Sequence, residues 1–198
     1  AISTLMLISL ISVFQAGTAS AISEGEYTGD YFDIAVSGNN NPWGITTDGT
    51  YIWITDFVDA EVYKYSMDGT YIDSFDTASS GNAGPAGITQ DGTYFWIVDT
   101  TDHEVYKYLM DGTYTGEHFD TDVSGNSQPR AITQDGTYFW ITDIGYPAEV
   151  YKYSMNGTYI DSFDTVASGG NYNDYPFGIT TYGTYIWIID SATDSVFK

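Results

Sequence analysis

The sequence predicts an all-β fold, a four-bladed β-propeller preceded by one apolar N-terminal α-helix. Two observations lead to the propeller. Tryptophan recurs at intervals of 43 to 47 residues, at Trp53, Trp96, Trp140 and Trp187, and each tryptophan lies in a similar series of short strands and tight turns. Repeats of this length are typical of blades with four strands each. A third observation, an apolar run at the start of the chain, predicts the helix.

The apolar run occupies residues 1–23, and no charged side chain occurs before Glu24. Its large side chains would spread around all sides of a helix, so that helix must be buried in a membrane or against other helices. These side chains are Ile2, Leu5, Met6, Leu7, Ile8, Leu10, Ile11, Val13 and Phe14. We therefore divide the chain into an N-terminal helix, 1–23, and a propeller, 24–198. A secretory signal peptide is the alternative, because Ala19-Ser20-Ala21 follows the run.

Each repeat begins with two short strands. The first contains Gly-Ile-Thr or Ala-Ile-Thr, and the second is rich in β-branched and aromatic residues around the tryptophan. In three repeats the two strands are separated by Asp-Gly, as at Asp48-Gly49, which suits the positive φ angles of a two-residue hairpin. The second strand ends at an aspartate in every repeat.

Two further strands complete a repeat, as at Glu61–Tyr65 and Tyr71–Asp76 in the first one. The last repeat ends inside its third strand. A match for the fourth strand occurs near the start of the chain, where Tyr27–Asp33 is similar to Tyr114–Asp120. We therefore expect Tyr27, Tyr31 and Phe32 to close a ring and remove its exposed sheet edge, either in their own chain or in a neighbour's.

The repeat resembles the blade of NHL-type propellers, which share the Gly-Ile strand, the glycine turn, Trp-Ile and the following aspartate. This resemblance covers residues 25–198 and implies architecture alone, because propellers have many unrelated functions. Those families usually have six or seven blades. Four-bladed rings of other families, such as hemopexin-like ones, often hold an ion in the central channel.

The N-terminal segment has a resemblance of its own. Ala1-Ile2-Ser3-Thr4-Leu5 is similar to the mature start of archaeal type IV pilins and archaellins. In those proteins the helices of many subunits bundle in the core of a filament. Bacterial pilins carry Glu at the fifth position, where this chain has Leu5.

The charge of the chain is strongly negative. It has 27 acidic and five basic residues, which argues against a nucleic-acid partner because phosphates require a basic surface. There is no cysteine. Acidic loop residues supply the oxygen ligands that Ca²⁺ prefers, so Ca²⁺ is the candidate cofactor, and Asp56, Asp59, Asp99 and Asp102 are its candidate ligands. The alternative is that the strand-ending aspartates cap turns.

Three further features concern sites. Small residues recur in the first strands, at Gly44, Gly87, Ala131 and Gly178, and we expect them to line a narrow axial channel. Arg130, the only arginine, is expected to pair with a nearby aspartate, and binding of a substrate is the alternative. Asn156 begins the only Asn-x-Ser/Thr sequence, so it is the predicted glycosylation site if the chain is extracellular.

The sequence contains no nucleophile motif, phosphate-binding loop or zinc signature, so we expect no enzyme. The first hypothesis is the structural subunit of an extracellular, cell-surface, pilus-like filament. It would be inserted in the membrane before assembly and would then form a helical homopolymer with the propeller outside, which adheres to surface glycans or other cells. The alternative is a membrane-anchored or secreted lectin-like binding propeller. A propeller lyase or hydrolase is the third and weakest hypothesis.

Overall fold

The computed structural model describes residues 29–165 and 175–198. The chain divides into two compact units, Ala1–Tyr31 and Phe32–Lys198, and the fold is that of the second unit. The expected apolar helix of residues 1–23 and the side chain of Tyr27 lie outside the described residues. The described part contains no helix that is both long and apolar enough to span a membrane.

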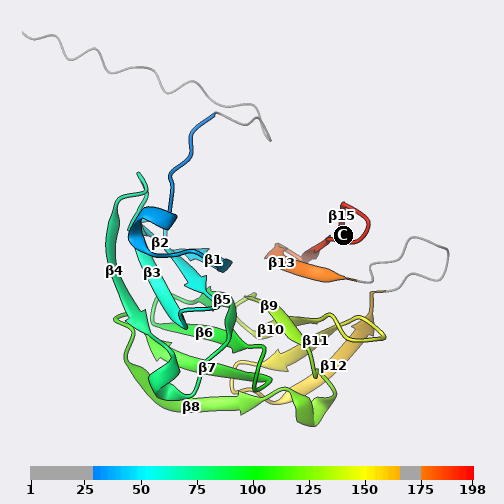
Figure 1. Ribbon diagram of the computed structural model, residues 1–198. Coiled ribbons are helices and arrows are strands. Elements are labelled where there is room, and N and C mark those ends of the chain that lie inside the picture. The colour runs from blue at the N-terminus through cyan, green and yellow to red at the C-terminus, as the bar shows by residue number, and fades with distance from the viewer. Residues whose placement is uncertain (1–28, 166–174) are drawn as a thin grey trace, which may run out of the picture. The chain divides into compact units, whose positions relative to one another are not determined.

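The second unit consists of four antiparallel sheets, which we call blades 1 to 4 (Figure 1). Blade 1 contains β1 (Pro42–Thr47), β2 (Tyr51–Asp56), β3 (Glu61–Ser66) and β4 (Tyr71–Asp76). Blade 2 contains β5 (Pro85–Gln90), β6 (Tyr94–Asp99), β7 (Glu104–Leu109) and β8 (Tyr114–Asp120). Blade 3 contains β9 (Pro129–Gln134), β10 (Tyr138–Asp143), β11 (Glu149–Ser154) and β12 (Tyr159–Asp164). Blade 4 contains β13 (Pro176–Tyr182), β14 (Tyr185–Asp190) and β15 (Ser195–Phe197). The predicted four-bladed, all-β propeller is confirmed.

Short 3₁₀ helices precede blades 1, 2 and 3. They are η1 (Ala35–Ser37), η2 (Ala78–Ser80) and η3 (Asp122–Ser124). A serine at the end of each one is hydrogen-bonded to a tyrosine hydroxyl on the third strand of the blade that follows, as between Ser80 and Tyr108 at 2.6 Å. These hydrogen bonds hold each 3₁₀ helix against the blade that follows it.

The apolar core lies between successive blades, and each blade has two different faces. We call the face with the repeated tryptophan the tryptophan face, and the face with the tyrosines of the third strand the tyrosine face. The tryptophan face of blade 1 contains Trp53 and Val62. It packs on the tyrosine face of blade 2, which includes Ile88, Phe95 and Tyr108. Blades 2 and 3 pack through the equivalent residues. Each of these two junctions therefore joins one tryptophan face to one tyrosine face.

The first strands of the blades surround the propeller axis, and side chains link the far ends of these strands. The Gln90 amide nitrogen donates to the carbonyl of Thr47 at 2.9 Å, and the Gln134 amide donates to the carbonyl of Gln90 at 3.0 Å. The Thr181 hydroxyl donates to the carbonyl of Gln134 at 3.1 Å. Each blade is thus tied to the one before it, from blade 1 to blade 4.

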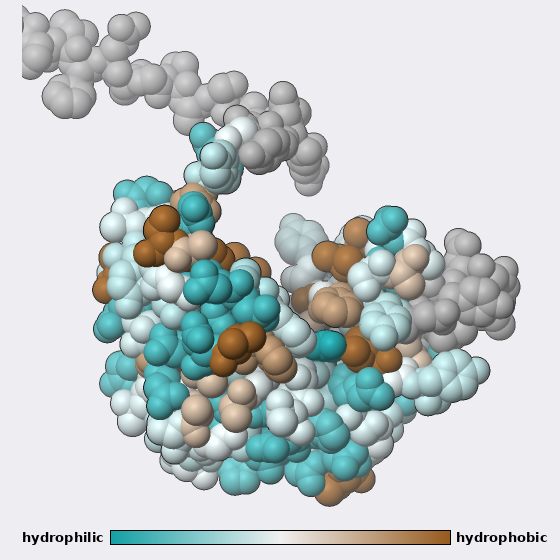
Figure 2. Space-filling model, viewed as in Figure 1, coloured by the Kyte–Doolittle hydropathy of each residue, from teal (hydrophilic) through white to brown (hydrophobic). Residues whose placement is uncertain are grey.

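Blade 4 has three strands among the described residues, and β15, the equivalent of the third strand in the other blades, lies at its edge. Residues 29–33 form no strand. Tyr31 is exposed, whereas Phe32 packs against Tyr65 of blade 1, with ring centroids 5.6 Å apart. Ring closure by residues 27–33 therefore stays a prediction. Figure 2 shows the surface hollowed between blade 1 and blade 4.

Candidate functional site

A pocket of about 350 Å³ lies on the propeller axis and is lined by the first strands of all four blades. Its wall includes the four small residues expected at the channel, Gly44, Gly87, Ala131 and Gly178. The strands approach closely here. A Cβ atom on Gly87 would lie 2.7 Å from both the Cα of Ala131 and the carbonyl oxygen of Arg130. Glycine is therefore required where blades 2 and 3 meet at the axis.

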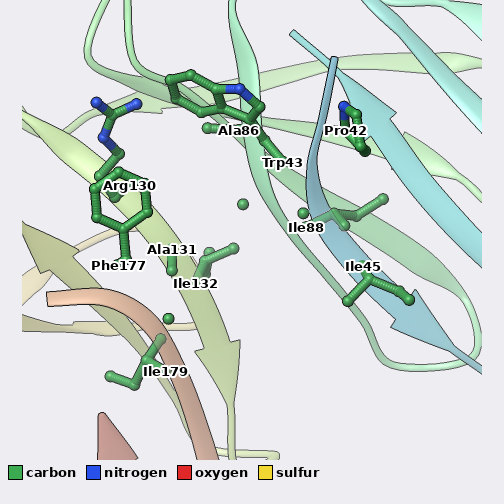
Figure 3. Close-up of a pocket in the computed structure, with 13 residues that line it drawn as sticks. Pro42, Trp43, Ile45, Ala86, Ile88, Arg130, Ala131, Ile132, Phe177 and Ile179 are labelled. Carbon is green, nitrogen blue, oxygen red and sulfur yellow. The ribbon is translucent and has the colours of Figure 1, made fainter. Parts of the chain in front are cut away.

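Arg130 and two aromatic rings gather at one side of this pocket (Figure 3). The guanidinium carbon of Arg130 lies 4.2 Å from the ring centroid of Trp43 on β1 and 5.0 Å from that of Phe177 on β13. Both distances are within the range of cation–π attraction. Arg130, on β9, therefore contacts the first and the last blade at once.

The two rings continue into a longer stacked row. Trp43 stacks on Phe57, with centroids 4.2 Å apart and planes 11° apart. Phe177 stacks on Tyr175, with centroids 6.2 Å apart and planes 15° apart. We call Phe57, Trp43, Arg130, Phe177 and Tyr175 the aromatic row. Because Trp43, Phe177 and Tyr175 remain substantially exposed, the row offers flat surfaces to a ligand.

Arg130 is a partly buried cation without an acidic partner in residues 29–165 and 175–198. The ion pairs there involve His103, Lys107 and His118 instead, and the Nε atom of Arg130 has no hydrogen-bond acceptor within them. Burial lowers the pKa of Arg130 from its ordinary value, but a guanidinium remains charged at neutral pH. The expected pairing with an aspartate is thus not observed, because the guanidinium is held between aromatic rings.

The strand-ending aspartates accept hydrogen bonds from the backbone. Oδ2 of Asp56 accepts from the N–H groups of Asn40 and Asn41, at 2.8 and 3.0 Å, and Oδ1 accepts from Val58 and Asp59, at 2.9 and 3.0 Å. Burial tends to raise the pKa of Asp56, but these hydrogen bonds together hold it below its ordinary value. Asp56 therefore caps two loops.

Asp99 has the same role, because it accepts from the N–H groups of Gly84, Thr101 and Asp102. Asp59 and Asp102 lie exposed in their loops. No cluster of three metal-ligating side chains occurs in the described part of the chain. The arrangement matches the turn-capping alternative, and Ca²⁺ binding stays a prediction. Asn156 is exposed in the turn between β11 and β12, and its glycosylation is likewise untested.

Sequence reasoning missed most of the aromatic row, although the sequence contains a signal for it. The second residue of the first strand differs in every blade, as Trp43, Ala86, Arg130 and Phe177. Its neighbours hardly change: proline precedes it, glycine or alanine follows it, and Ile-Thr comes next. A position that varies inside an otherwise constant repeat is free of the shared requirements of the fold. It is therefore a better candidate for function than the repeated residues.

No protein-family model and no curated protein matches this chain. It is similar in structure to virginiamycin B lyase from Staphylococcus aureus, with a TM-score of 0.59 and 21% identity over 78% of this chain and 50% of that one. It is also similar to glutaminyl cyclase from Myxococcus xanthus, with a TM-score of 0.60 and 11% identity over 80% of this chain and 72% of that one. A chain of a nidogen/laminin complex matches with a TM-score of 0.54 and 20% identity, over 78% of this chain and 74% of that one.

These similarities show the fold alone, and this chain spans about half the length of the lyase. They nevertheless correct one expectation. Absence of a catalytic motif led us to expect no enzyme, but the same fold carries a lyase and a cyclase. Short catalytic motifs belong to particular families, so their absence does not exclude catalysis on a propeller. None of these similar proteins indicates a pilus filament subunit.

Proposed function

We propose that this chain is a ligand-binding β-propeller whose ligand enters the axial pocket and places an anionic group on Arg130. The observation that supports this most strongly is the guanidinium itself. It is a cation held at the edge of a pocket by Trp43 and Phe177, and no carboxylate of the described residues neutralises it. Such a group forms strong, charge-assisted hydrogen bonds with a carboxylate or a similar anion.

The rest of the pocket suggests the body of the ligand. Among the described residues, its wall consists of backbone, small residues and isoleucines, and Arg130 is the only ionisable side chain that lines it. A flat apolar body would stack on the exposed rings and contact the isoleucines. The ligand should carry a single anionic group, because the net charge of −22 repels anions at long range.

Binding at the axis is consistent with both a recognition role and a catalytic role. The filament, its self-assembly, the adhesive partners and the extracellular location rest on residues 1–23 and stay predictions. They are not needed for this proposal.

The test uses two probes with the same ring system, indole-3-acetate and its neutral amide, in isothermal titration calorimetry. We expect the carboxylate to bind at least about tenfold more tightly, a difference of about 1.4 kcal/mol. Arg130→Gln should remove the preference, whereas Lys64→Gln should keep it. Lys64 is a matched control because it also lies over aromatic rings, those of Tyr51 and Trp53, but outside the axial pocket.

The salt dependence gives a second readout. Added salt should strengthen binding of indole-3-acetate modestly, because it screens the long-range repulsion more than the close contact with Arg130. Equal affinity for the two probes, or a preference that survives in Arg130→Gln, would contradict the proposal. Failure of both probes to bind would count against it as well.

A further inference from the structure

The two end blades expose apolar residues that are buried in the inner blades. On the tryptophan face of blade 4, Val196 is 63% exposed, whereas the equivalent Val62, Val105 and Val150 are at most 1% exposed. On the tyrosine face of blade 1, Ile45 is 66% exposed, whereas the equivalent Ile88 is 4% exposed. These two faces therefore lack the neighbour that every inner face has.

The two exposed faces are complementary. Between blades 1 and 2, and again between blades 2 and 3, the tryptophan face of one blade packs on the tyrosine face of the next. The exposed tryptophan face of blade 4 presents Trp187, Ile189 and Val196. On the tyrosine face of blade 1, Ile54, Tyr63 and Tyr65 are buried in a cluster with Phe32 and Ile34. The part of this face that stays uncovered presents Ile45 beside the partly covered Ile52. The tryptophan face of blade 4 and the tyrosine face of blade 1 thus both have uncovered apolar residues, and they lie on the last and the first blade of the same chain.

The two surfaces do not meet within the chain. Successive first strands pack together, β1 with β5, β5 with β9 and β9 with β13, whereas Figure 1 shows β13 apart from β1. The lyase chain continues beyond the part that this chain matches, which is 50% of its length. A second copy would continue the series of blades in a similar way.

We propose that two copies of this chain associate head to tail, with the tryptophan face of blade 4 in each copy packed on the tyrosine face of blade 1 in the other. Contacts of this kind join unlike surfaces, and a ring results when the rotation closes. Two such contacts bury both exposed faces of both copies. The proposal does not depend on the ligand at the axis.

Phe32 and Asp33 support this arrangement, because they contact blade 1 in the same way as the fourth strand of one blade contacts the next blade. The Phe32 ring lies 5.6 Å from that of Tyr65, and Phe75, on outer strand β4, lies 5.6 Å from Tyr108 in the next blade. Asp33 accepts a hydrogen bond from the N–H of Ala35, just as Asp76 accepts one from Ala78. In the dimer, these two residues would lie beside β15 of the other copy.

The pairing between third and outer strands fixes the expected register. In blade 1, Glu61 pairs with Asp76 and Val62 pairs with Phe75. By equivalence, Ser195 of one copy should pair with Asp33 of the other. The net charge of −22 on each copy opposes association, so the dimer should be favoured by added salt.

The first test measures mass by sedimentation equilibrium over a range of concentrations and salt. We expect a monomer–dimer equilibrium that shifts toward dimer with salt. Val196→Asp and Ile45→Asp should each weaken dimerisation at least tenfold, since each would place a charge in the apolar junction. Ile72→Asp is the matched control, because Ile72 on β4 is exposed to the same extent as the equivalent Ile160 of inner blade 3, so a neighbouring blade does not cover this position. All three sites are exposed, so circular dichroism should show folded variants.

The second test uses cysteine pairs, since the chain has no cysteine of its own. We mix the single variants Asp33→Cys and Ser195→Cys under oxidising conditions, and we expect a disulfide-linked heterodimer. The double variant Glu61→Cys/Asp76→Cys is the positive control for this register within one blade. Concentration-independent monomers would overturn the proposal. So would an intramolecular disulfide in monomeric Asp33→Cys/Ser195→Cys, because the ring would then close on itself.

Discussion

Blade 2 and blade 4 are built from equivalent residues, yet they differ in burial. Val105 and Trp96, on the tryptophan face of blade 2, are buried against blade 3. The equivalent Val196 is exposed and Trp187 is only partly buried. The repeat therefore determines the strands and turns of a blade, but its neighbours determine how much of it is buried. Matched substitutions at equivalent positions can separate the two contributions.

The largest difference should appear at the tryptophans. We expect Trp96→Ala to lower the free energy of unfolding by about 3–5 kcal/mol, because it opens a cavity in a packed junction. Trp187→Ala should cost less than half as much, because its face has no blade beside it. Urea unfolding at low protein concentration measures both. Equal losses would mean that blade 4 is covered as fully as blade 2.

A second pair of substitutions compares the two blades at the axis. Gly87→Ala should destabilise the fold by about 1–3 kcal/mol, because the new Cβ would lie 2.7 Å from blade 3. Gly178→Ala should change stability by less than about 0.5 kcal/mol, since its Cβ would meet only Ile189, at 3.5 Å or more. Thermal unfolding tests both. A large loss for Gly178→Ala would indicate that another strand lies against β13.

The loop-capping aspartates should behave alike in the first and the last blade, because their hydrogen bonds lie within a blade and its own loops. Burial tends to raise the pKa of Asp56 and of Asp190, but backbone hydrogen bonds hold both below the ordinary value. Their ionised forms therefore stabilise the fold above the unfolded pKa of about 4, and that contribution is lost as the pH falls through the lower folded pKa.

We expect Asp56→Asn and Asp190→Asn to cost about 1–3 kcal/mol each at pH 7. The cost should shrink as the pH falls below about 4, where the unfolded-state carboxylates become protonated, and it should be lost once the pH passes the lower folded pKa. Chemical unfolding at a series of pH values measures this change. A loss confined to one of the two variants would show that the caps depend on neighbouring blades.

A small effect on stability is also expected at Arg130, which contacts both end blades. Its cation–π contacts contribute about 0.5–2 kcal/mol, but the partial burial of its charge opposes this gain. Arg130→Met should therefore change the free energy of unfolding by no more than about 1 kcal/mol, although it removes the anion site. A loss of several kcal/mol would mean that Arg130 holds blades 1 and 4 together.

Much of this protein follows from local features of its sequence. Asp48-Gly49 and its counterparts specify tight turns, and the residues around each tryptophan favour strands, so blade number and strand order could be predicted without a structure. The small residues Gly44, Gly87, Ala131 and Gly178 could likewise be placed near the axis, because they recur at one position of the repeat. Such signals act between residues that are close in the chain.

The candidate site was decided by the tertiary structure. Phe57, Trp43, Arg130, Phe177 and Tyr175 come from three blades and their loops, and no spacing in the sequence indicates that their rings would stack. The choice between an aspartate and an aromatic partner for Arg130 also required the fold. Whether Val196 and Ile45 meet another surface depends on the angle between successive blades. Close packing across several junctions sets that angle, and one repeat by itself contains no record of it.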